Sequence, residues 1–213
     1  MMILHDLSQK LIEGMAVYPG DPAFQARPHL TFERDGVNVL SLSFGSHAGT
    51  HVDAPRHFLR DGEAVDALPL DRFCGPARLV RLEGRPGEPL RIPSTALDDV
   101  QPGEILVIGT GWEREAGTPR YFTECPVFAA DVPDRLVSAG IKALAVDLPT
   151  VVSEGDSRAM HVRLLSAGIV LVEGLVGLSA LRGPRFRFFA APLRLSGADG
   201  SPVRAFAVED EEA

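Results

Sequence analysis

Cysteine is scarce in this sequence. The 213 residues contain only Cys74 and Cys125, and the two do not form a C-x-x-C pair. Two cysteines are too few for the disulfide framework of a small secreted protein. We therefore expect a reducing, cytoplasmic compartment, and a single long-range disulfide between the two remains the alternative.

Lysine is equally rare, and basic charge is not concentrated anywhere. Lys10 and Lys142 are the only lysines, the arginines are scattered, and the formal net charge is −8 with a pI near 5.2. Proteins that bind nucleic acids usually present a concentrated basic face to the phosphates. We expect no nucleic-acid partner.

Long hydrophobic runs are also missing. Residues 1–14 lack a basic region followed by an apolar stretch of signal-peptide length. The longest apolar region, 167–181, is interrupted by Glu173, Gly174 and Gly177, whereas a membrane-spanning helix needs about 20 consecutive apolar residues. We expect no membrane partner.

The composition that is present is ordinary for a globular domain. Hydrophobic residues make up 45% and charged residues 23% of the chain, which argues against disorder, collagen and coiled coils. No linker rich in proline, glycine or serine divides the chain. We therefore expect one domain over residues 1–213.

Strand patterns outnumber helix patterns. Helices are expected at 131–140 and 157–168, because each segment begins near an Asp or Ser cap and stops at Gly140 or Gly168. An apolar strand follows each helix, and this order predicts a mixed, partly parallel sheet in an α/β or α+β domain. The expected strands are 2–7, 37–45, 77–83, 104–109, 142–147, 169–174, 185–196 and 202–208.

Segment 46–58, SHAGTHVDAPRHF, gathers three histidines and an aspartate at odd-numbered positions. They are His47, His51, Asp53 and His57. Side chains of an extended segment alternate between two faces, so all four can face one way. Pro55 argues against a helix here, and the alternating pattern of 37–44 argues for a preceding strand. We expect the cluster at the end of that strand and in the loop after it.

This cluster is typical of a metal site. Neutral imidazole and carboxylate are ligands that zinc, manganese and iron accept. Three ligands close in sequence leave coordination positions open for water, which hydrolytic sites activate. An isolated histidine is more often held by hydrogen bonds alone, but four aligned residues favour a metal. A structural metal in a non-catalytic protein is the alternative from another class, and such sites usually have four protein ligands.

Glu173 and His161 stand out by context. Glu173 interrupts the apolar run GIVLVEGLVGL, and a buried carboxylate is costly unless a cation or another partner compensates it. An arginine partner or exposure at the strand end would also explain it. His161 lies in the preceding predicted helix, where an exposed histidine is the simpler interpretation. Together the two could complete a metal site.

HAGTHVDAPRHF resembles the H-x-G-T-H-x-D-x-P-x-H-F signature of the cyclase family of metal-dependent hydrolases, which includes bacterial kynurenine formamidases and isatin hydrolases. The resemblance continues, in order, through VYPGDPAF, LPLDRFCGPARLV, ILVIGTGW, MHVRLLSAGIVLVEGL and PLRLSGADGSPVRAFAV. It implies a fold of the swivelling β/β/α type, assembly as a homo-oligomer (dimer or tetramer), and hydrolysis of an amide in a small, often aromatic substrate.

The resemblance also implies a role for each matching residue. The metal ligands would be His47, His51 and Asp53 for a first ion, with Asp53 able to bridge to a second, and His161 and Glu173 as the remaining ligands. His57 would be the general acid/base. One or two divalent ions per chain are implied, with zinc favoured and manganese the alternative. In this hypothesis metal-bound hydroxide attacks the amide carbonyl, and His57 passes a proton to the leaving amine.

Aromatic residues near these motifs could form an apolar wall for the substrate. The candidates are Tyr18, Phe24, Phe58 and Trp112. Tyr18 and Trp112 are favoured for substrate binding because YPGD and GTGW are glycine-rich loops, although each also fits a plain core position.

Two features depart from the kynurenine formamidase pattern. They are Thr50, where that subgroup tends to have alanine, and DLPTVVSEG at 147–155. An arylformamide of the N-formylkynurenine type is still the expected substrate. A cyclic amide such as isatin, or cyclisation of a polyketide-like substrate, is the alternative.

Overall fold

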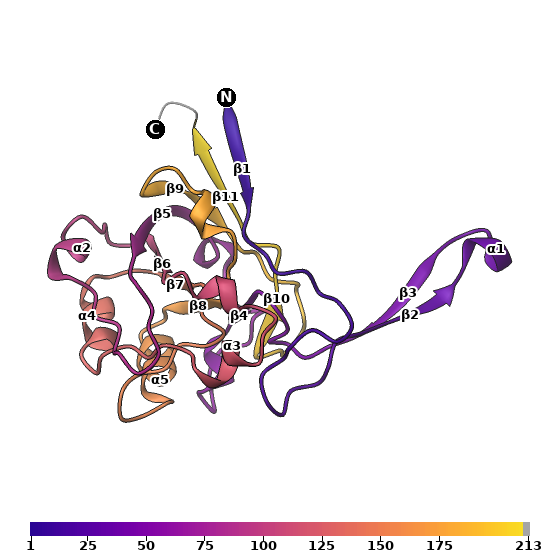
Figure 1. Ribbon diagram of the computed structural model, residues 1–213, viewed down its shortest axis with the longest axis horizontal. Helices are drawn as coiled ribbons and strands as arrows, with labels where there is room; N and C mark the ends of the chain where they lie inside the picture. The colour runs from indigo at the N-terminus through magenta and orange to yellow at the C-terminus, as the bar shows by residue number, and fades with distance from the viewer. Residues whose placement is uncertain (211–213) are drawn as a thin grey trace.

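The computed structural model describes residues 1–210, and a nine-stranded mixed sheet forms its body (Figure 1). In chain order these strands are β1 (Met2–Asp6), β4 (His51–Asp53), β5 (Cys74–Arg81), β6 (Ile105–Gly109), β7 (Ala143–Val146), β8 (Val170–Glu173), β9 (Arg185–Phe189), β10 (Gly200–Pro202) and β11 (Phe206–Asp210). Across the sheet they are ordered β1-β11-β9-β5-β6-β7-β8-β4-β10.

The centre of the sheet is parallel and both flanks are antiparallel. Strands β5 to β8 run parallel to one another, whereas β9, β11 and β1 on one side and β4 and β10 on the other pair antiparallel. The sequences of β6, β7 and β8 are apolar almost throughout, as expected for strands covered on both faces. The predicted mixed, partly parallel sheet is confirmed.

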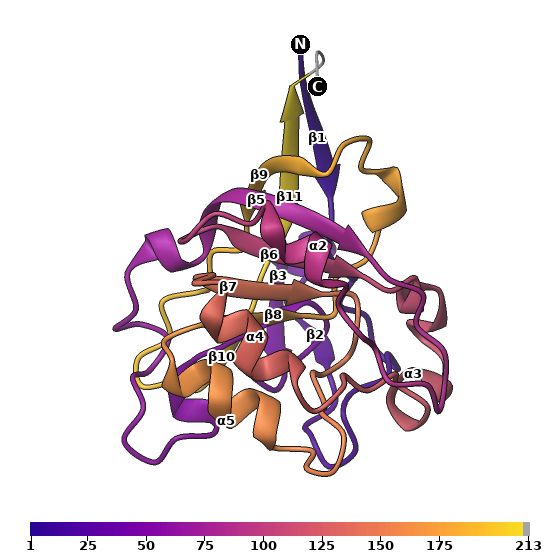
Figure 2. The same cartoon turned by 90° about the vertical axis from the view of Figure 1, so that its left-hand side faces the viewer.

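Helices α4 (Val132–Ser138) and α5 (Ala159–Ser166) lie side by side against one face of this sheet (Figure 2). They form where helices were predicted, one or two residues shorter at each end. Gly140 and Gly168 follow them with φ of +69° and +74°, a left-handed conformation that ends a helix and that glycine adopts without strain. The shorter helices α2 (Ser94–Asp98) and α3 (Arg120–Thr123) lie in the connections.

Alternate side chains of the central strands pack into two hydrophobic cores, one on each face of the sheet. Leu144 of β7 packs on the helix face with Leu164 of α5, while its neighbour Ala145 faces the second core with Val172 of β8. Side chains on both faces of the parallel strands are thereby buried. Within residues 1–210, no helix combines the length and the apolar character that a membrane span requires.

A hairpin arm, residues 25–43, projects from this body (Figure 1). It consists of β2 (Gln25–Leu30), the single-turn helix α1 (Phe32–Asp35) and β3 (Val39–Ser43), which pair as a separate two-stranded sheet. The strand predicted at 37–45 therefore exists but belongs to the arm and does not lead directly into the histidine cluster. The prediction missed the next strand, β4, because three residues are too short to show a periodic pattern.

Candidate metal centre

Strand β4 places His51 and Asp53 on one face of the sheet, between β8 and β10. His51 is directly opposite Glu173 of β8, and Asp53 is opposite Gly200 of β10. His51 Nε2 lies 3.4 Å from Glu173 Oε2 and 3.5 Å from Asp53 Oδ1. The pairing register of β4 with β8 thus brings together His51 and Glu173, which are more than a hundred positions apart in sequence.

The turn before β4 and helix α5 supply the other two histidines. In the turn, His47 Nδ1 lies 2.9 Å from Asp53 Oδ1, and Gly49 has a φ of +64° that reverses the chain. From α5, His161 Nε2 lies 3.6 Å from Asp53 Oδ2 and 3.4 Å from Glu173 Oε1. The structure therefore gathers all five residues predicted as metal ligands around Asp53.

Glu173 is fully enclosed in this cluster. Its exposed fraction is 2%, and that of Asp53 is 1%, so each carboxylate needs compensating partners. Besides the two histidines, Glu173 Oε1 accepts a hydrogen bond of 2.8 Å from the backbone N–H of Val151. The structure thus decides between the two interpretations of Glu173: its side-chain partners are histidines of the cluster, and no arginine of residues 1–210 is among them.

The charges of the cluster shift its pKa values in opposite directions. Burial lowers the pKa of His47, but the hydrogen bonds and charges of Asp53 and Asp199 outweigh burial and raise that pKa to about 9. Burial and the charge of Asp53 raise the pKa of Glu173, yet hydrogen bonds with His161 and His51 hold it below its ordinary value. The protein alone therefore favours ionised carboxylates beside protonated histidines, an arrangement in which a cation can replace the protons.

The donor atoms fit a divalent metal. His47, His51 and Asp53 form one set, and Asp53, His161 and Glu173 form another that shares Asp53. Donor atoms that bind one ion at about 2.0–2.2 Å lie roughly 3–3.6 Å apart, and the four separations within these two sets agree to within about 0.1 Å. Asp53 Oδ2 is buried without a hydrogen-bond partner among the described residues, which is costly unless a cation approaches it.

Backbone contacts orient the candidate ligands. His51 Nδ1 lies 2.9 Å from the carbonyl oxygen of Gly49, which leaves Nε2 facing the carboxylates. Thr50 Oγ1 accepts the backbone N–H of Gln9 at 2.9 Å and donates to the carbonyl of Gly174 at 2.7 Å. Thr50 therefore ties the start of β4 to the end of β8, next to Glu173.

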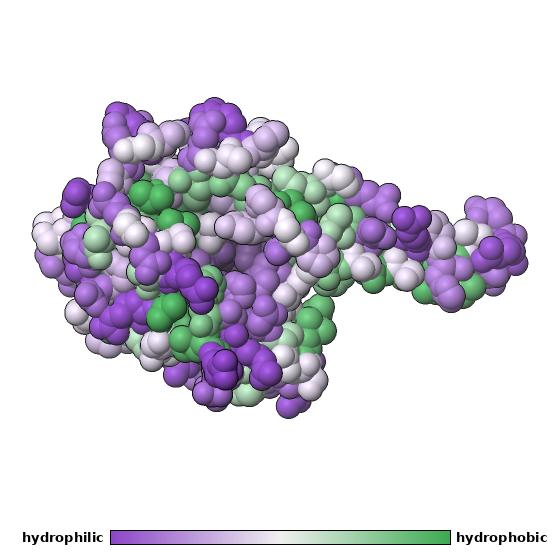
Figure 3. All heavy atoms as spheres, turned by 90° about the horizontal axis from the view of Figure 1, so that it is seen from below, coloured by the Kyte–Doolittle hydropathy of each residue, from purple (hydrophilic) through white to green (hydrophobic). Residues whose placement is uncertain are grey.

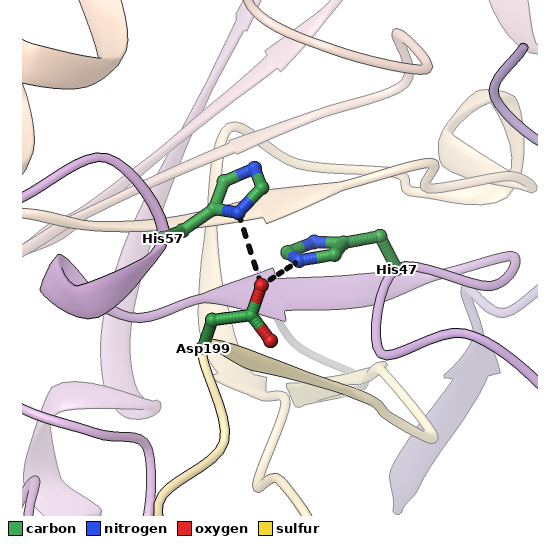
Figure 4. Close-up of side chains that lie close together, drawn as sticks. All are labelled: His47, His57 and Asp199. Carbon is green, nitrogen blue, oxygen red and sulfur yellow. Dashed lines mark hydrogen bonds and ion pairs between the residues drawn. The ribbon is translucent and has the colours of Figure 1, made fainter. Parts of the chain in front are cut away.

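His57 lies beside the cluster in the 3₁₀ turn Pro55–His57 (Figure 4). Its ring centroid is 4.0 Å from that of His47, and its Nδ1 is 3.2 Å from Oδ2 of Asp199. Burial lowers the pKa of His57 below its ordinary value. Burial also raises the pKa of Asp199, but the hydrogen bonds from His47 and Ser46 and the charge of His47 together outweigh burial and lower that pKa to about 2. A neutral imidazole next to an ionised carboxylate is suited to proton transfer.

A cavity of about 300 Å³ lies over the cluster, lined by His47, His51, His57, His161 and Glu173 on its floor. Its aromatic walls are Phe58, Tyr121 and Phe122, with Tyr18 in edge contact with Phe122 at a centroid distance of 6.0 Å. Tyr18 is 49% exposed, so it stands at the mouth of the cavity.

Two of the aromatic candidates do not line this cavity. Trp112 is 1% exposed in the core, where its Nε1 donates to the carbonyl of Tyr121 at 3.1 Å. Phe24 stacks on Phe44. The prediction that Trp112 binds substrate is corrected accordingly: Trp112 packs in the core against Tyr121 and does not line the cavity.

Asp199 was not among the predicted site residues. Neither were several residues of the cavity, among them Tyr121, Phe122 and Arg158. Asp199 could have been noticed as an acidic residue in the glycine-rich segment SGADGSP, between two predicted strands. Tyr121 and Phe122 carry no local signal, because only the packing of α3 brings them to the cavity.

Comparison with known proteins agrees with this geometry. The family model described as "Putative cyclase" matches residues 5–151. A kynurenine formamidase of Salinibacter ruber is 36% identical over 211 residues and covers 96% of both chains, and one of Bacillus cereus is 35% identical over 204 residues and covers 94% of both. These values are well above what chance similarity would produce over a whole domain.

Solved structures have the same fold. A potential metal-dependent hydrolase with cyclase activity superposes with a TM-score of 0.80 at 27% identity, covering 99% of this chain and 100% of the other. An isatin hydrolase bound to thioisatinate superposes with a TM-score of 0.86 at 19% identity, covering 99% and 93%, a likeness of fold alone. The match of the family model and the identity to the curated relatives together show that the chain belongs to the cyclase family.

Proposed function

We propose that this protein is a metal-dependent amidohydrolase that cleaves the C–N bond of an arylformamide of the N-formylkynurenine type. The observation that carries this proposal is the buried cluster around Asp53, which opens into a cavity with aromatic walls. The relatives named kynurenine formamidases support it over nearly the whole chain. The walls Phe58 and Phe122 suit an aryl ring of the substrate.

The five clustered residues would hold the metal. We place one ion between His47, His51 and Asp53, and a second between Asp53, His161 and Glu173. Zinc is our first choice and manganese the alternative, because imidazole and carboxylate ligands suit both ions. When bound, a divalent ion lowers the pKa of water and polarises an amide carbonyl.

The protein's own contribution to the chemistry would be proton transfer by His57. Its Nδ1 faces Asp199, so the opposite edge of the ring, with Nε2, is the edge available to a substrate (Figure 4). The lowered pKa keeps the imidazole neutral near pH 7, ready to accept a proton as water adds to the amide. His57 then donates this proton to the departing aryl amine, which completes cleavage of the C–N bond.

Elemental analysis of the purified protein, paired with hydrolysis assays, tests this function. We expect one or two ions per chain, and hydrolysis of N-formylkynurenine that disappears on chelation and returns with zinc or manganese. Isatin is assayed in parallel. Hydrolysis of isatin alone would replace the proposed substrate with a cyclic amide. A protein that binds no metal after reconstitution would contradict the proposed function entirely.

We also propose a homo-oligomer assembled through the hairpin arm. Paired residues of the arm share a face, and one face is apolar, formed by Ala26, Pro28, Leu40 and Leu42. Leu40 is 58% and Leu42 54% exposed, and Figure 3 shows hydrophobic residues along the arm outside the body. A two-stranded hairpin with an uncovered apolar face is marginal in water. A second copy of the chain is the partner we propose to cover it, because most soluble oligomers are symmetric homo-oligomers.

A cytoplasmic location is the last part of the proposal. Cys74 and Cys125 are both free thiols in the structure, so the long-range disulfide does not form. Free thiols persist in a reducing compartment. Burial also raises the pKa of the Cys125 thiol to about 12, so very little of the reactive thiolate forms near neutral pH.

A further inference from the structure

One carboxylate oxygen joins the metal centre to the proton-transfer residue. Asp199 Oδ2 lies 3.0 Å from Nε2 of His47 and 3.2 Å from Nδ1 of His57 (Figure 4). An ionised carboxylate only accepts hydrogen bonds, so both ring nitrogens must carry a proton to make them. The contact therefore places a proton on Nε2 of His47 and on Nδ1 of His57 at once.

Asp199 is itself held in place. Ser46 Oγ donates a hydrogen bond of 2.9 Å to Oδ1, the other oxygen of the carboxylate. The carbonyl oxygen of Asp199 accepts the backbone N–H of Ala54 at 2.9 Å. The side chain and the backbone of Asp199 are thus both hydrogen-bonded to the segment that carries His47 and His57. Its Oδ2 atom is left to accept hydrogen bonds from the two imidazoles.

The next residue, Gly200, lies so close to the ring of His47 that a side chain would not fit there. A Cβ added to Gly200 would lie 2.7 Å from Cε1 of His47 and 2.6 Å from the carbonyl oxygen of Val52. Real Cβ atoms essentially never approach so closely, so glycine is needed for β10 to pair with β4 here. The approach of β10 brings Asp199 within hydrogen-bond distance of both histidines.

We propose that Asp199 is the positioning residue of this site, orienting His57 for proton transfer and His47 for metal binding through the shared oxygen Oδ2. Holding the proton of His57 on Nδ1 leaves Nε2 as the proton acceptor at the cavity. Holding a proton of His47 on Nε2 leaves Nδ1, 2.9 Å from Asp53 Oδ1, as the atom that would lose its proton to bind a metal. The role assigned through His57 rests on the proposed function.

Asp199→Asn tests this proposal, with Asp66→Asn as the matched control. Asp66 Oδ1 accepts the backbone N–H of Gly197 in the same loop, but Asp66 is not among the contacts of either imidazole. We expect Asp199→Asn to lower kcat about 10- to 100-fold at saturating zinc, with KM nearly unchanged. Asp66→Asn should retain wild-type kcat. If Asp199→Asn retained wild-type kcat, the proposal would be wrong.

A double-mutant cycle separates positioning from a general structural role. If Asp199 acts through His57, Asp199→Asn should cost little further activity in a His57→Ala background. An equal loss of kcat in both backgrounds would overturn the assignment through His57.

Nitrogen-15 NMR of the histidine rings gives a readout that needs no substrate. In the wild-type protein, metal-free or loaded with zinc, we expect His57 in the Nδ1–H tautomer, and Asp199→Asn should abolish this preference. An Nε2–H tautomer of His57 in the wild type would overturn the proposal even if the variant failed to fold. Because the spectrum is independent of turnover, an inactive enzyme with the expected tautomer would contradict only the proposed substrate.

Discussion

His51 of β4 and Glu173 of β8 are directly opposite each other in an antiparallel ladder, with Nε2 and Oε2 3.4 Å apart. Neither residue is accessible to bulk water, since their exposed fractions are 4% and 2%. This cross-strand pair connects the signature segment to the distant end of β8. It also makes the register of the sheet a determinant of the geometry of this cluster.

Replacing Glu173 with glutamine should therefore weaken metal binding. Glu173→Gln keeps the shape of the side chain but removes the negative charge that faces His51 and His161. We expect at least about a 10- to 100-fold loss of zinc affinity by titration calorimetry. Glu154→Gln, at an exposed position, is the control and should bind zinc normally. Unchanged affinity in Glu173→Gln would remove this residue from the ligand set.

Variants of His57 and His51 should separate catalysis from metal binding. His57→Ala should lower kcat by about 10²- to 10⁴-fold, the contribution usual for a general acid/base, while metal content stays close to wild type. His51→Ala should lose metal, because its Nε2 faces both carboxylates of the cluster. Elemental analysis and kinetics on the same preparations test both expectations. Full turnover in His57→Ala would contradict its role.

Zinc affinity should increase with pH up to about pH 9. Asp53 and Asp199 raise the pKa of His47 to about 9 against the effect of burial, so in the metal-free protein this imidazole is protonated at neutral pH. A metal must displace that proton, which costs affinity at pH values below about 9, and the raised pKa values of His51 and His161 add to this competition. Titrations from pH 6 to 10 should show apparent affinity rising and then levelling off. A flat profile below pH 9 would mean that His47 is not a ligand.

Arg158 should distinguish substrates by their side chains. The guanidinium lines the cavity, 5.2 Å from the ring centroid of Phe58, where it can meet the carboxylate of an amino-acid tail. We expect Arg158→Gln to raise KM for N-formylkynurenine several-fold and to leave KM for formanilide, which lacks the tail, unchanged. Arg163→Gln, exposed on α5 and outside the cavity, is the control. Equal effects on both substrates would contradict this assignment.

Charge on the apolar face of the arm should dissociate the oligomer. Leu40→Lys with Leu42→Lys places two ammonium groups where we propose that a second copy packs. We expect the molar mass from light scattering to fall to that of one chain, 22.9 kDa. Substituting the serines of the polar face, Ser41 and Ser43, with lysine is the control, and the oligomer should persist. A wild-type protein that is already monomeric would rule out the proposed assembly.

The clustering of the candidate ligands was largely predictable because its first members are close in sequence. His47, His51 and Asp53 come together through local geometry, since a turn and a three-residue strand place them on one side of the backbone. The central strands and both long helices were predictable for a similar reason: apolar runs and glycine stops are local signals.

Other features depend on contacts between distant segments and left no comparable signal. Trp112 occupies a glycine-rich loop that looked suited to a binding site, yet the packing of Tyr121 encloses it in the core. The strand predicted at 37–45 exists, but it pairs in the separate sheet of the arm. Alternation of side chains predicts a strand and does not indicate which strand it pairs with.

By itself, the sequence determined the types of the candidate ligands, their alternation along the chain, and the parallel core that supports them. Tertiary structure alone decided which partners complete the cluster. The register of β4 with β8 aligns Glu173 with His51, and the close approach of β10 at Gly200 brings Asp199 to two imidazoles. The physical reason is that strand pairing and close packing are set by the sum of many distant contacts, which no short stretch of sequence contains.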